Sequence, residues 1–523
     1  MLFNSYIFIF FFLPLCLMGF YILQNKQATL AKVWLTCFSL WFYGYFNQRY
    51  LLIMICSIIG NYLIHGWIVR TRDAEVEKVD NRRKALSKSK SIMITGVSLN
   101  LAVLFYFKYF DFFLDNVNSL FGSSIPLKNI LLPLGISFFT FQQISFLVDT
   151  YRGELDTVSF VDYALFVSFF PQLIAGPIVV HEEMLPQFNR IGKDNRSREE
   201  KAEIFTKGVY VFILGLAKKV LIADTFGIAV DLAYSNVNAM NGLESLLTIL
   251  FYSLQLYFDF SGYCDMAKGI AGMFGMRIAN NFNSPYKAIN IVDFWKRWHI
   301  TLSRFFTKNI YIPLGGNRKG EGRMYLNYLI VFFLSGLWHG AGWNFVLWGM
   351  MHGVLYVVTK WWLGRKKTNV KEQKVPDAQG NRRIVTVLGS AKKAIACLLT
   401  FLYVSIAWVY FRASDVGQGN TLLMNIFTKE WALPGSGFTD AFNLGEFWYI
   451  LKILKVAALP YAKYYIMVLF SVFAVVITFA GKNIDELAEK FKPTIINAIV
   501  TAFLFVWCVV SLSGVSTFLY FNF

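Results

Sequence analysis

Long apolar stretches separated by short polar segments run along the whole chain. The clearest of them cover residues 6–23, 33–45, 50–69, 92–113, 130–148, 163–178, 205–222, 246–260, 325–337, 345–362, 394–411, 464–479 and 495–512. A helix that crosses a bilayer needs about 20 apolar residues, so we expect the shorter stretches to be re-entrant or tilted helices buried in protein. The pattern predicts an all-α polytopic membrane protein with about 11 transmembrane helices plus re-entrant and interfacial helices.

The composition supports this expectation and gives the basic residues a role. Hydrophobic types make up 56% of the chain and charged types only 16%, whereas soluble domains carry about 25% charged residues. The net charge of +18 would suggest nucleic-acid binding in a soluble protein. Here the basic residues gather in short loops between apolar stretches, so we expect them to set the membrane orientation, with no nucleic-acid partner.

The positive-inside rule gives that orientation. The loops richest in Lys and Arg are residues 70–90, 190–207, 318–323 and 364–393, which we expect in the cytoplasm. Lys26 and Lys32 follow the first stretch, and Lys490 and Lys492 precede the last one, so both chain termini are expected on the opposite side. No internal repeat is visible, which weighs against a transporter built from duplicated halves.

The segment 257–352 differs from the rest because polar and ionisable residues alternate with aromatic ones inside an apolar chain. Such groups are costly at membrane depth and usually mark function. Three of the five histidines lie here: His299, His339 and His352. The spacing matches no metal-ligand pattern and no nucleophile elbow, so we expect no metal site.

His339 lies in SGLWHGAGW, where glycines can end a helix and let a ligand or another backbone approach closely. Apolar surroundings disfavour the cationic form of an imidazole. A neutral ring could accept a proton from a hydroxyl or a phenol. The alternative is a helix-packing histidine bonded to a carbonyl, but the glycine and tryptophan frame favours catalysis.

His299 lies in FWKRWHITLS, where Trp295, Trp298 and Leu302 recur at spacings of three and four. This predicts one amphipathic helix. The helix could lie in the headgroup region with its basic residues in water, or it could cap a reaction chamber with His299 turned inward. The sequence leaves both interpretations open. We expect His352 to be structural.

Five motifs carry a family resemblance: FFPQLIAGPIVVHEEMLPQF (169–188), LYFDFSGYCDMAKGIAGMFG (256–275), NFNSPYKAINIVDFWKRWHITLSRF (281–305), YIPLGGNR (311–318) and LSGLWHGAGWNFVLWGMMHG (334–353). They resemble the membrane-bound O-acyltransferase superfamily, and within it the alginate O-acetyltransferase branch. The resemblance implies helices around a central funnel. It implies N-terminal transmembrane helices in 1–131, a catalytic core in 132–362, and C-terminal helices with an extracytoplasmic loop and an aromatic tail in 363–523.

The resemblance also implies roles for single residues. His339 is the expected catalytic residue, and His299 is expected to be the second one. The substrate channel is expected to be lined by Trp338, Trp298, Asn281 and Asp259.

The activity implied is transfer of an acyl group, with acetyl favoured, to an extracytoplasmic polysaccharide, alginate-type or another cell-envelope polymer. The donor would be acetyl-CoA or an acyl carrier protein thioester on the cytoplasmic side, with no bound cofactor. An exported SGNH-type acetyltransferase is the expected partner, and the bacterial cytoplasmic membrane the expected location. The alternatives are D-alanyl transfer to teichoic acid, a lipid or protein O-acyltransferase, and, more distantly, a transporter.

The chain ends in TFLYFNF (517–523). This tail resembles the aromatic C-terminal peptide of D-alanylation systems and alginate-type acetyltransferases, in which a tyrosine is proposed to carry the acyl group. By that resemblance Tyr520 would be an acyl relay, once a base removes its phenol proton. The alternative is an aromatic anchor at the membrane surface.

Overall fold

The computed structural model describes residues 1–76, 82–369, 381–443, 445–456, 459–514 and 518–519, and these residues form helices and loops without a strand. Contacts divide the chain into two units. Unit 1 comprises Met1–Leu216, Tyr263–Ala279 and Phe491–Phe505; unit 2 comprises Ala217–Gly262, Asn280–Lys490 and Val506–Phe523. The division into 1–131, 132–362 and 363–523 that we expect from the sequence describes functional regions, whereas these units are defined by contacts. That division stays a prediction.

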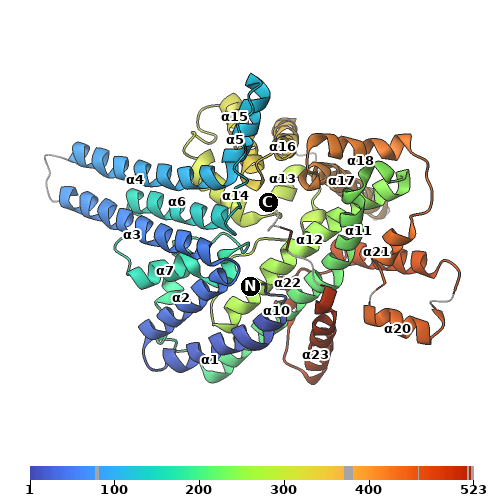
Figure 1. Cartoon of the computed structure of the whole chain (residues 1–523), viewed down its shortest axis with the longest axis horizontal. Coiled ribbons are helices and arrows are strands. Elements are labelled where there is room, and N and C mark those ends of the chain that lie inside the picture. Colours follow the sequence, from blue (N-terminus) through green and yellow to red (C-terminus); the bar gives the residue numbers. More distant parts are fainter. Residues whose placement is uncertain (77–81, 370–380, 444, 457–458, 515–517, 520–523) are drawn as a thin grey trace. The chain divides into compact units, whose positions relative to one another are not determined.

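Unit 1 is built from helix pairs (Figure 1). Its main helices are α1 (Leu13–Gln24), α2 (Ala28–Gly44), α3 (Gln48–Val76), α4 (Arg82–Leu104), α5 (Phe110–Phe121), α6 (Ile136–Arg152), α7 (Phe160–Ser168), α9 (His181–Phe188) and α10 (Arg198–Ala217). Helices α3, α4 and α6 lie side by side. Polar side chains join them, since Asn100 donates to Asn61 at 2.6 Å and Ser57 donates to Gln143 at 2.8 Å. Such hydrogen bonds hold helices together where lipid supplies no competing water.

Unit 2 carries the histidine-rich segment. Its helices are α11 (Asp224–Ser235), part of α12 (Gly242–Met273), α13 (Ile291–Trp295), α14 (Ile300–Phe306), α15 (Glu321–His339), α16 (Trp343–Asn369), α17 (Asn381–Arg412), α18 (Val416–Thr428), α19 (Ser436–Asp440), α20 (Gly445–Ile453), α21 (Ala462–Phe479) and α22 (Ile484–Lys490). The last long helix, α23 (Ile495–Val510), belongs partly to each unit.

A close crossing of α15 and α16 positions His339. A Cβ atom added at Gly336 of α15 would collide with the carbonyl of Phe345 on α16, and one at Gly349 of α16 would collide with the carbonyl of Phe332 on α15. Only glycine fits at both contacts. The hairpin therefore brings the end of α15 against the first turns of α16.

Four of the described helical segments are long and apolar enough to cross a membrane: Gln48–Asp73, Lys88–Phe121, Ala391–Arg412 and Ala462–Phe479. Phe8–Gln24 and Ile495–Val510 are shorter apolar helices. Their large apolar side chains point outward, as Leu63 (66% exposed) and Leu469 (69% exposed) do. The all-helical membrane architecture is confirmed at this level, whereas a count of about 11 spans is not.

Two stretches are broken where the sequence suggested continuity. Residues 163–178 form α7 and the short α8 (Phe170–Leu173), and all are buried, in line with a helix covered by protein. The expectation of one amphipathic helix around His299 is wrong. The chain breaks between α13 and α14 because the backbone of Ile300 donates to the carbonyl of Asn281 at 3.0 Å, instead of continuing the helix.

Candidate functional site

His339 is the last residue of α15, and the chain leaves the helix at Gly340 in an extended conformation. Its Nδ1 lies 2.6 Å from the carbonyl oxygen of Ser335, one turn earlier. A carbonyl can only accept, so Nδ1 carries the proton and, in the neutral ring, Nε2 carries the lone pair that can accept a proton. This is the tautomer that a general base requires.

Aromatic side chains surround the His339 ring, which is 3% exposed. Its centroid lies 4.8 Å from those of Trp338 and Trp348 and 5.2 Å from that of Phe411. Phe411 comes from α17, whose end is tied to α16 because Asn344 donates to the carbonyl of Ala413 at 2.8 Å. Three helices of unit 2 thus build one apolar cage around one imidazole.

His299 lies beside this cage, and the centroid of its ring is 6.4 Å from that of the His339 ring. It is fully buried and caps the start of α14 with a φ of 45°, a left-handed conformation that is uncommon for histidine. Its Nδ1 lies 3.1 Å from Oδ1 of Asn281, which also accepts from the backbone and the hydroxyl of Thr301. Asn281 therefore orients the ring and accepts the Nδ1 proton. Of the two interpretations left open, the inward-facing one agrees with the structure.

The other predicted channel residues lie in unit 2 as well. The Trp338 ring lies near both histidines, 4.8 Å from His339 and 6.0 Å from His299 by ring centroids. Trp298 packs on Trp408 at 4.9 Å, and Trp408 in turn packs on Trp348 and Phe411 of the cage. Asp259 on α12 is 1% exposed and lies 2.6 Å from Nζ of Lys219. Tyr520 lies outside the described residues.

The remaining histidines are engaged in packing. Nδ1 of His352 accepts from the indole of Trp295 at 3.3 Å. His65 bonds the hydroxyl of Thr150 at 2.9 Å. The position of His352 agrees with the structural role that we expected for it.

Sequence reasoning missed several members of the site. The carbonyl of Ser335 is a backbone group and carries no sequence signal, and Phe411 and Trp408 lie far along the chain. Lys219 did carry a signal, because it is a cation within the apolar stretch 205–222.

A cavity of about 540 Å³ opens next to the site in unit 2. It is lined by α13, α14, α15 and α16 and includes Ser335, whose carbonyl holds His339. Three basic side chains also line it: Lys296, Arg304 and Lys308. The cavity therefore combines an apolar wall with cationic residues, close to the catalytic candidate.

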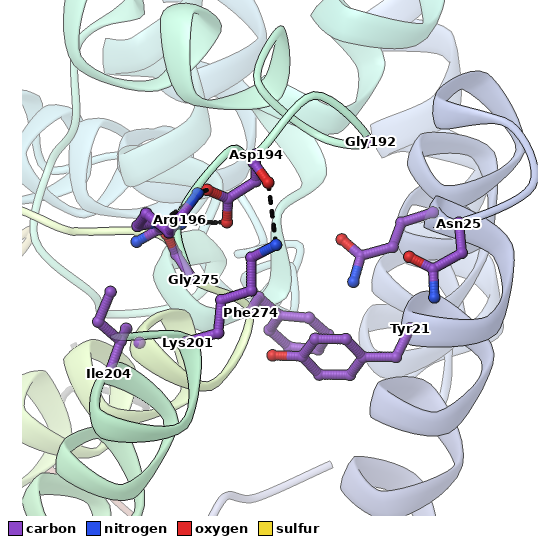
Figure 2. Close-up of a pocket in the computed structure, with 11 residues that line it drawn as sticks. Tyr21, Asn25, Gly192, Asp194, Arg196, Lys201, Ile204, Phe274 and Gly275 are labelled. Carbon is purple, nitrogen blue, oxygen red and sulfur yellow. Dashed lines mark hydrogen bonds and ion pairs between the residues drawn. The ribbon is translucent and has the colours of Figure 1, made fainter. Parts of the chain in front are cut away.

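Unit 1 holds a smaller polar cavity of about 90 Å³. Figure 2 shows Tyr21 of α1 and Asn25, the residue after α1, facing Asp194, Arg196 and Lys201 across it. Arg196 binds Asp194 with two hydrogen bonds of 2.8 Å and holds the pKa of that carboxyl below its usual value. Both cations are bonded to Asp194, so this cluster ties the loop before α10 to the first turn of that helix.

Asp149, His181 and Glu182 bring possible metal-ligand atoms within 4.8 Å of one another among the described residues. The sequence did not suggest this group, because Asp149 lies on α6 and the other two on α9. Nε2 of His181 lies 3.1 Å from the carboxylate of Asp149, and Nη1 of Arg152 lies 3.8 Å from its other oxygen. The neighbouring Arg cation favours an ion-pair interpretation over a bound metal.

Comparison with known proteins gives consistent results. A model described as the membrane-bound O-acyltransferase family matches residues 91–399, more than half of the chain. A peptidoglycan O-acetyltransferase of Helicobacter pylori is 37% identical, and the alignment covers 100% of this chain and 98% of that protein. A probable alginate O-acetylase of Pseudomonas aeruginosa is 37% identical over 80% of this chain and 73% of its own length. A teichoic acid D-alanyltransferase of Streptococcus thermophilus is 28% identical over 47% of this chain.

Proposed function

The chain belongs to the membrane-bound O-acyltransferase family, and from this premise we propose that it carries acetyl groups across the bacterial cytoplasmic membrane to an envelope polysaccharide. As a member of that family it is an integral membrane acyltransferase. The observation that carries the proposal is His339, which is buried in an aromatic cage with its Nδ1 proton donated to Ser335.

Peptidoglycan is the acceptor to test first. The relative named for peptidoglycan aligns with the chain from end to end, whereas the relative named for alginate covers 80% of it. The D-alanyltransferases share less than this, both in identity and in coverage. Acetyl transfer is therefore favoured over D-alanyl transfer. All the relatives named here are transferases, which leaves the transporter alternative without support.

The chemistry follows from the tautomer of His339. Nε2 takes the proton of an attacking hydroxyl while the oxygen forms a bond to the acetyl carbonyl carbon. The carbon–sulfur bond of the thioester then breaks, and the thiol leaves with that proton. His299 lies close enough to bond the same reacting groups, and Asn281 holds it in place.

The unit 2 cavity is the proposed entry for the donor. Its basic side chains suit the phosphates of coenzyme A or of a phosphopantetheine arm, and its apolar wall suits the arm itself. The proposal requires the cavity mouth to face the cytoplasm, where thioester donors are made.

The orientation proposed from the basic loops has support within unit 1. The 24–28 turn and the 189–197 loop, both expected in the cytoplasm, lie against each other. Nζ of Lys32 bonds Asn189 at 3.4 Å, and a Cβ at Gly192 would lie 3.1 Å from the carbonyl of Gln24. We propose that both chain termini lie outside, that about 11 spans form the fold, and that an exported SGNH-type partner receives the acetyl group there.

We further propose that Tyr520 relays the acetyl group. Its phenol would attack the thioester with His339 as base, and a serine of the partner would then take the acetyl group and release the phenol. Tyr520→Phe removes only the nucleophilic oxygen. We expect that variant to abolish acetylation at normal protein level. Unaltered acetylation would eliminate the relay while leaving the role of His339 untouched.

The whole proposal is tested by composition. Deletion of the gene should remove ester-linked acetate from peptidoglycan, and the wild-type gene should restore it. His339→Ala should fail to restore it, with a loss of at least about 100-fold because the general base is gone. Full restoration by His339→Ala would refute the catalytic assignment.

A further inference from the structure

A buried ion cluster lies in unit 2 apart from the two histidines. Nζ of Lys219, on η4 (Lys218–Ala223), lies 2.7 Å from Asp224 and 2.6 Å from Asp259. The side chains of Lys219, Asp224 and Asp259 are 3%, 9% and 1% exposed. Burying such groups is costly and is no reliable source of stability, so the cluster calls for a specific use.

The second oxygen of Asp259 points to that use. While Oδ1 binds Lys219, Oδ2 accepts the backbone N–H of Leu519 at 3.1 Å. Leu519 and Phe518 are 5% and 2% exposed, and the rings of Phe518 and Phe260 lie 6.1 Å apart. A segment 260 residues away in the sequence is therefore held against α12.

Phe260 links this contact to the site, because its ring also lies 4.9 Å from that of His299. The docked segment is thus one side chain away from the catalytic candidates. Leu519 immediately precedes Tyr520, and consecutive Cα atoms are about 3.8 Å apart. A hold on Leu519 limits how far the Tyr520 phenol can move from the site.

We propose that Lys219 and Asp259 form a clasp that holds the C-terminal tail, with Asp259 as a positioning residue for the acyl relay. The role of the clasp in the acyl relay rests on the proposed function. The contact between Asp259 and the tail does not depend on it. Lys219 fixes the carboxylate so that Oδ2 faces the tail amide. A hydrogen bond to an ionised carboxylate is roughly twice as strong as a neutral one, so the charge of Asp259 strengthens the hold.

The test measures tail mobility in the full chain. A nitroxide is attached at Asn522→Cys, in a background whose six native cysteines are replaced, and its spectrum is recorded in lipid nanodiscs. The exchanged pair K219D/D259K keeps a buried ion pair but places at 259 a side chain that cannot accept a hydrogen bond. We expect its spectrum to sharpen to that of a mobile tail. A spectrum like that of the unexchanged protein would show that the pair is only structural.

A second variant avoids the core, in case the exchanged pair does not fold. Leu519→Pro removes the donor N–H from the tail itself, and Leu519→Val is its control because it keeps the N–H. Asp224→Asn is the matched control in the cluster, since Asp224 binds Lys219 whereas Asp259 is the residue that accepts the Leu519 N–H. We expect a mobile tail in Leu519→Pro only. Equal spectra in these three variants would overturn the clasp.

Acetylation then separates the clasp from the relay. If both hold, Leu519→Pro lowers acetylation at least tenfold while Leu519→Val does not. If Leu519→Pro frees the tail but Tyr520→Phe acetylates normally, the clasp stands and the relay is refuted. If Tyr520→Phe is inactive and the tail is equally mobile in every variant, the relay stands and the clasp is refuted.

Discussion

At the scale of single residues, the site depends on hydrogen bonds that choose a tautomer. Nδ1 of His339 and Nδ1 of His299 each face an oxygen that can only accept, from Ser335 and Asn281 respectively. Both rings therefore present Nε2 as the acceptor when neutral. His352 is oriented the other way, because its Nδ1 accepts from Trp295. The three buried histidines therefore differ in tautomer: Nδ1 carries the proton in His339 and His299, whereas Nδ1 is the acceptor in His352.

The contrast between His339 and His352 is testable with one substitution. Phenylalanine keeps the aromatic packing at each position but supplies no base. We expect His339→Phe to abolish acetylation, whereas His352→Phe should keep most of it and lose about 1–3 kcal/mol of stability, because the Trp295 indole N–H loses its acceptor. Polysaccharide acetate and thermal unfolding of the purified protein measure the two effects. An inactive but stable His352→Phe would give that histidine a catalytic role.

Asn281 should act through His299. Asn281→Ala removes the acceptor for the His299 ring and for both donors of Thr301, so His299 loses its orientation. We expect acetylation to fall by about 10–100-fold, less than the loss of a general base. Asn283→Ala, at an exposed site two residues away, is the control. Near-normal acetylation in Asn281→Ala would mean that His299 needs no such support.

At the scale of elements, the α15–α16 hairpin determines where His339 lies. The helices meet through glycine at Gly336 and Gly349, with the backbone of each against the other. The break between α13 and α14 determines where His299 lies. It forms because the backbone N–H of Ile300 donates to the carbonyl of Asn281 and so does not continue the helix. The elements therefore supply position, and the side chains supply chemistry.

A methyl group at the crossing should separate the two helices. Gly336→Ala places a Cβ against the carbonyl of Phe345, and overpacking of this kind costs about 1–3 kcal/mol. We expect a lower unfolding temperature and reduced acetylation. Gly364→Ala, on the partner helix α16 but in open space, should leave both unchanged or stabilise slightly. Equal behaviour of the two variants would show that the close crossing is not required.

At the scale of the whole molecule, the orientation in the membrane decides which partners the protein meets. The basic loops predict that Lys193 faces the cytoplasm and that the 412–463 segment, which holds α18 and α19, lies outside. Under the proposed function, this arrangement puts the donor on one side and the polysaccharide on the other. The transfer then needs a path through the protein, and not only a site on it.

Labelling with a membrane-impermeant maleimide checks this orientation. Lys193→Cys and Ala432→Cys both place a thiol on an exposed residue. Each variant is made in the protein without its six native cysteines and expressed in intact spheroplasts. We expect Ala432→Cys to label and Lys193→Cys to label only after permeabilisation. The reverse pattern would invert the proposed topology and move the donor cavity to the wrong side.

The sequence by itself determined the helical membrane class and the approximate helices, and it predicted catalytic roles for His339 and His299. The class, the helices and the prediction for His339 follow from local composition, since apolar length, glycine spacing and ionisable groups in an apolar chain are readable without contacts. The role of His299 was implied by the family resemblance. The motifs also indicated the family, which the comparisons confirmed.

Only the tertiary structure decided the orientation of the imidazoles and the partners that enforce it. The Ser335 carbonyl, the rings of Phe411 and Trp408, and the Lys219–Asp259–Leu519 contact join groups by position in space. The left-handed turn at His299 was hidden as well, because Trp295, Trp298 and Leu302 have helical spacing and only the hydrogen bonds of Asn281 override it. Local pattern specifies elements, whereas long-range hydrogen bonds and ring packing specify the site.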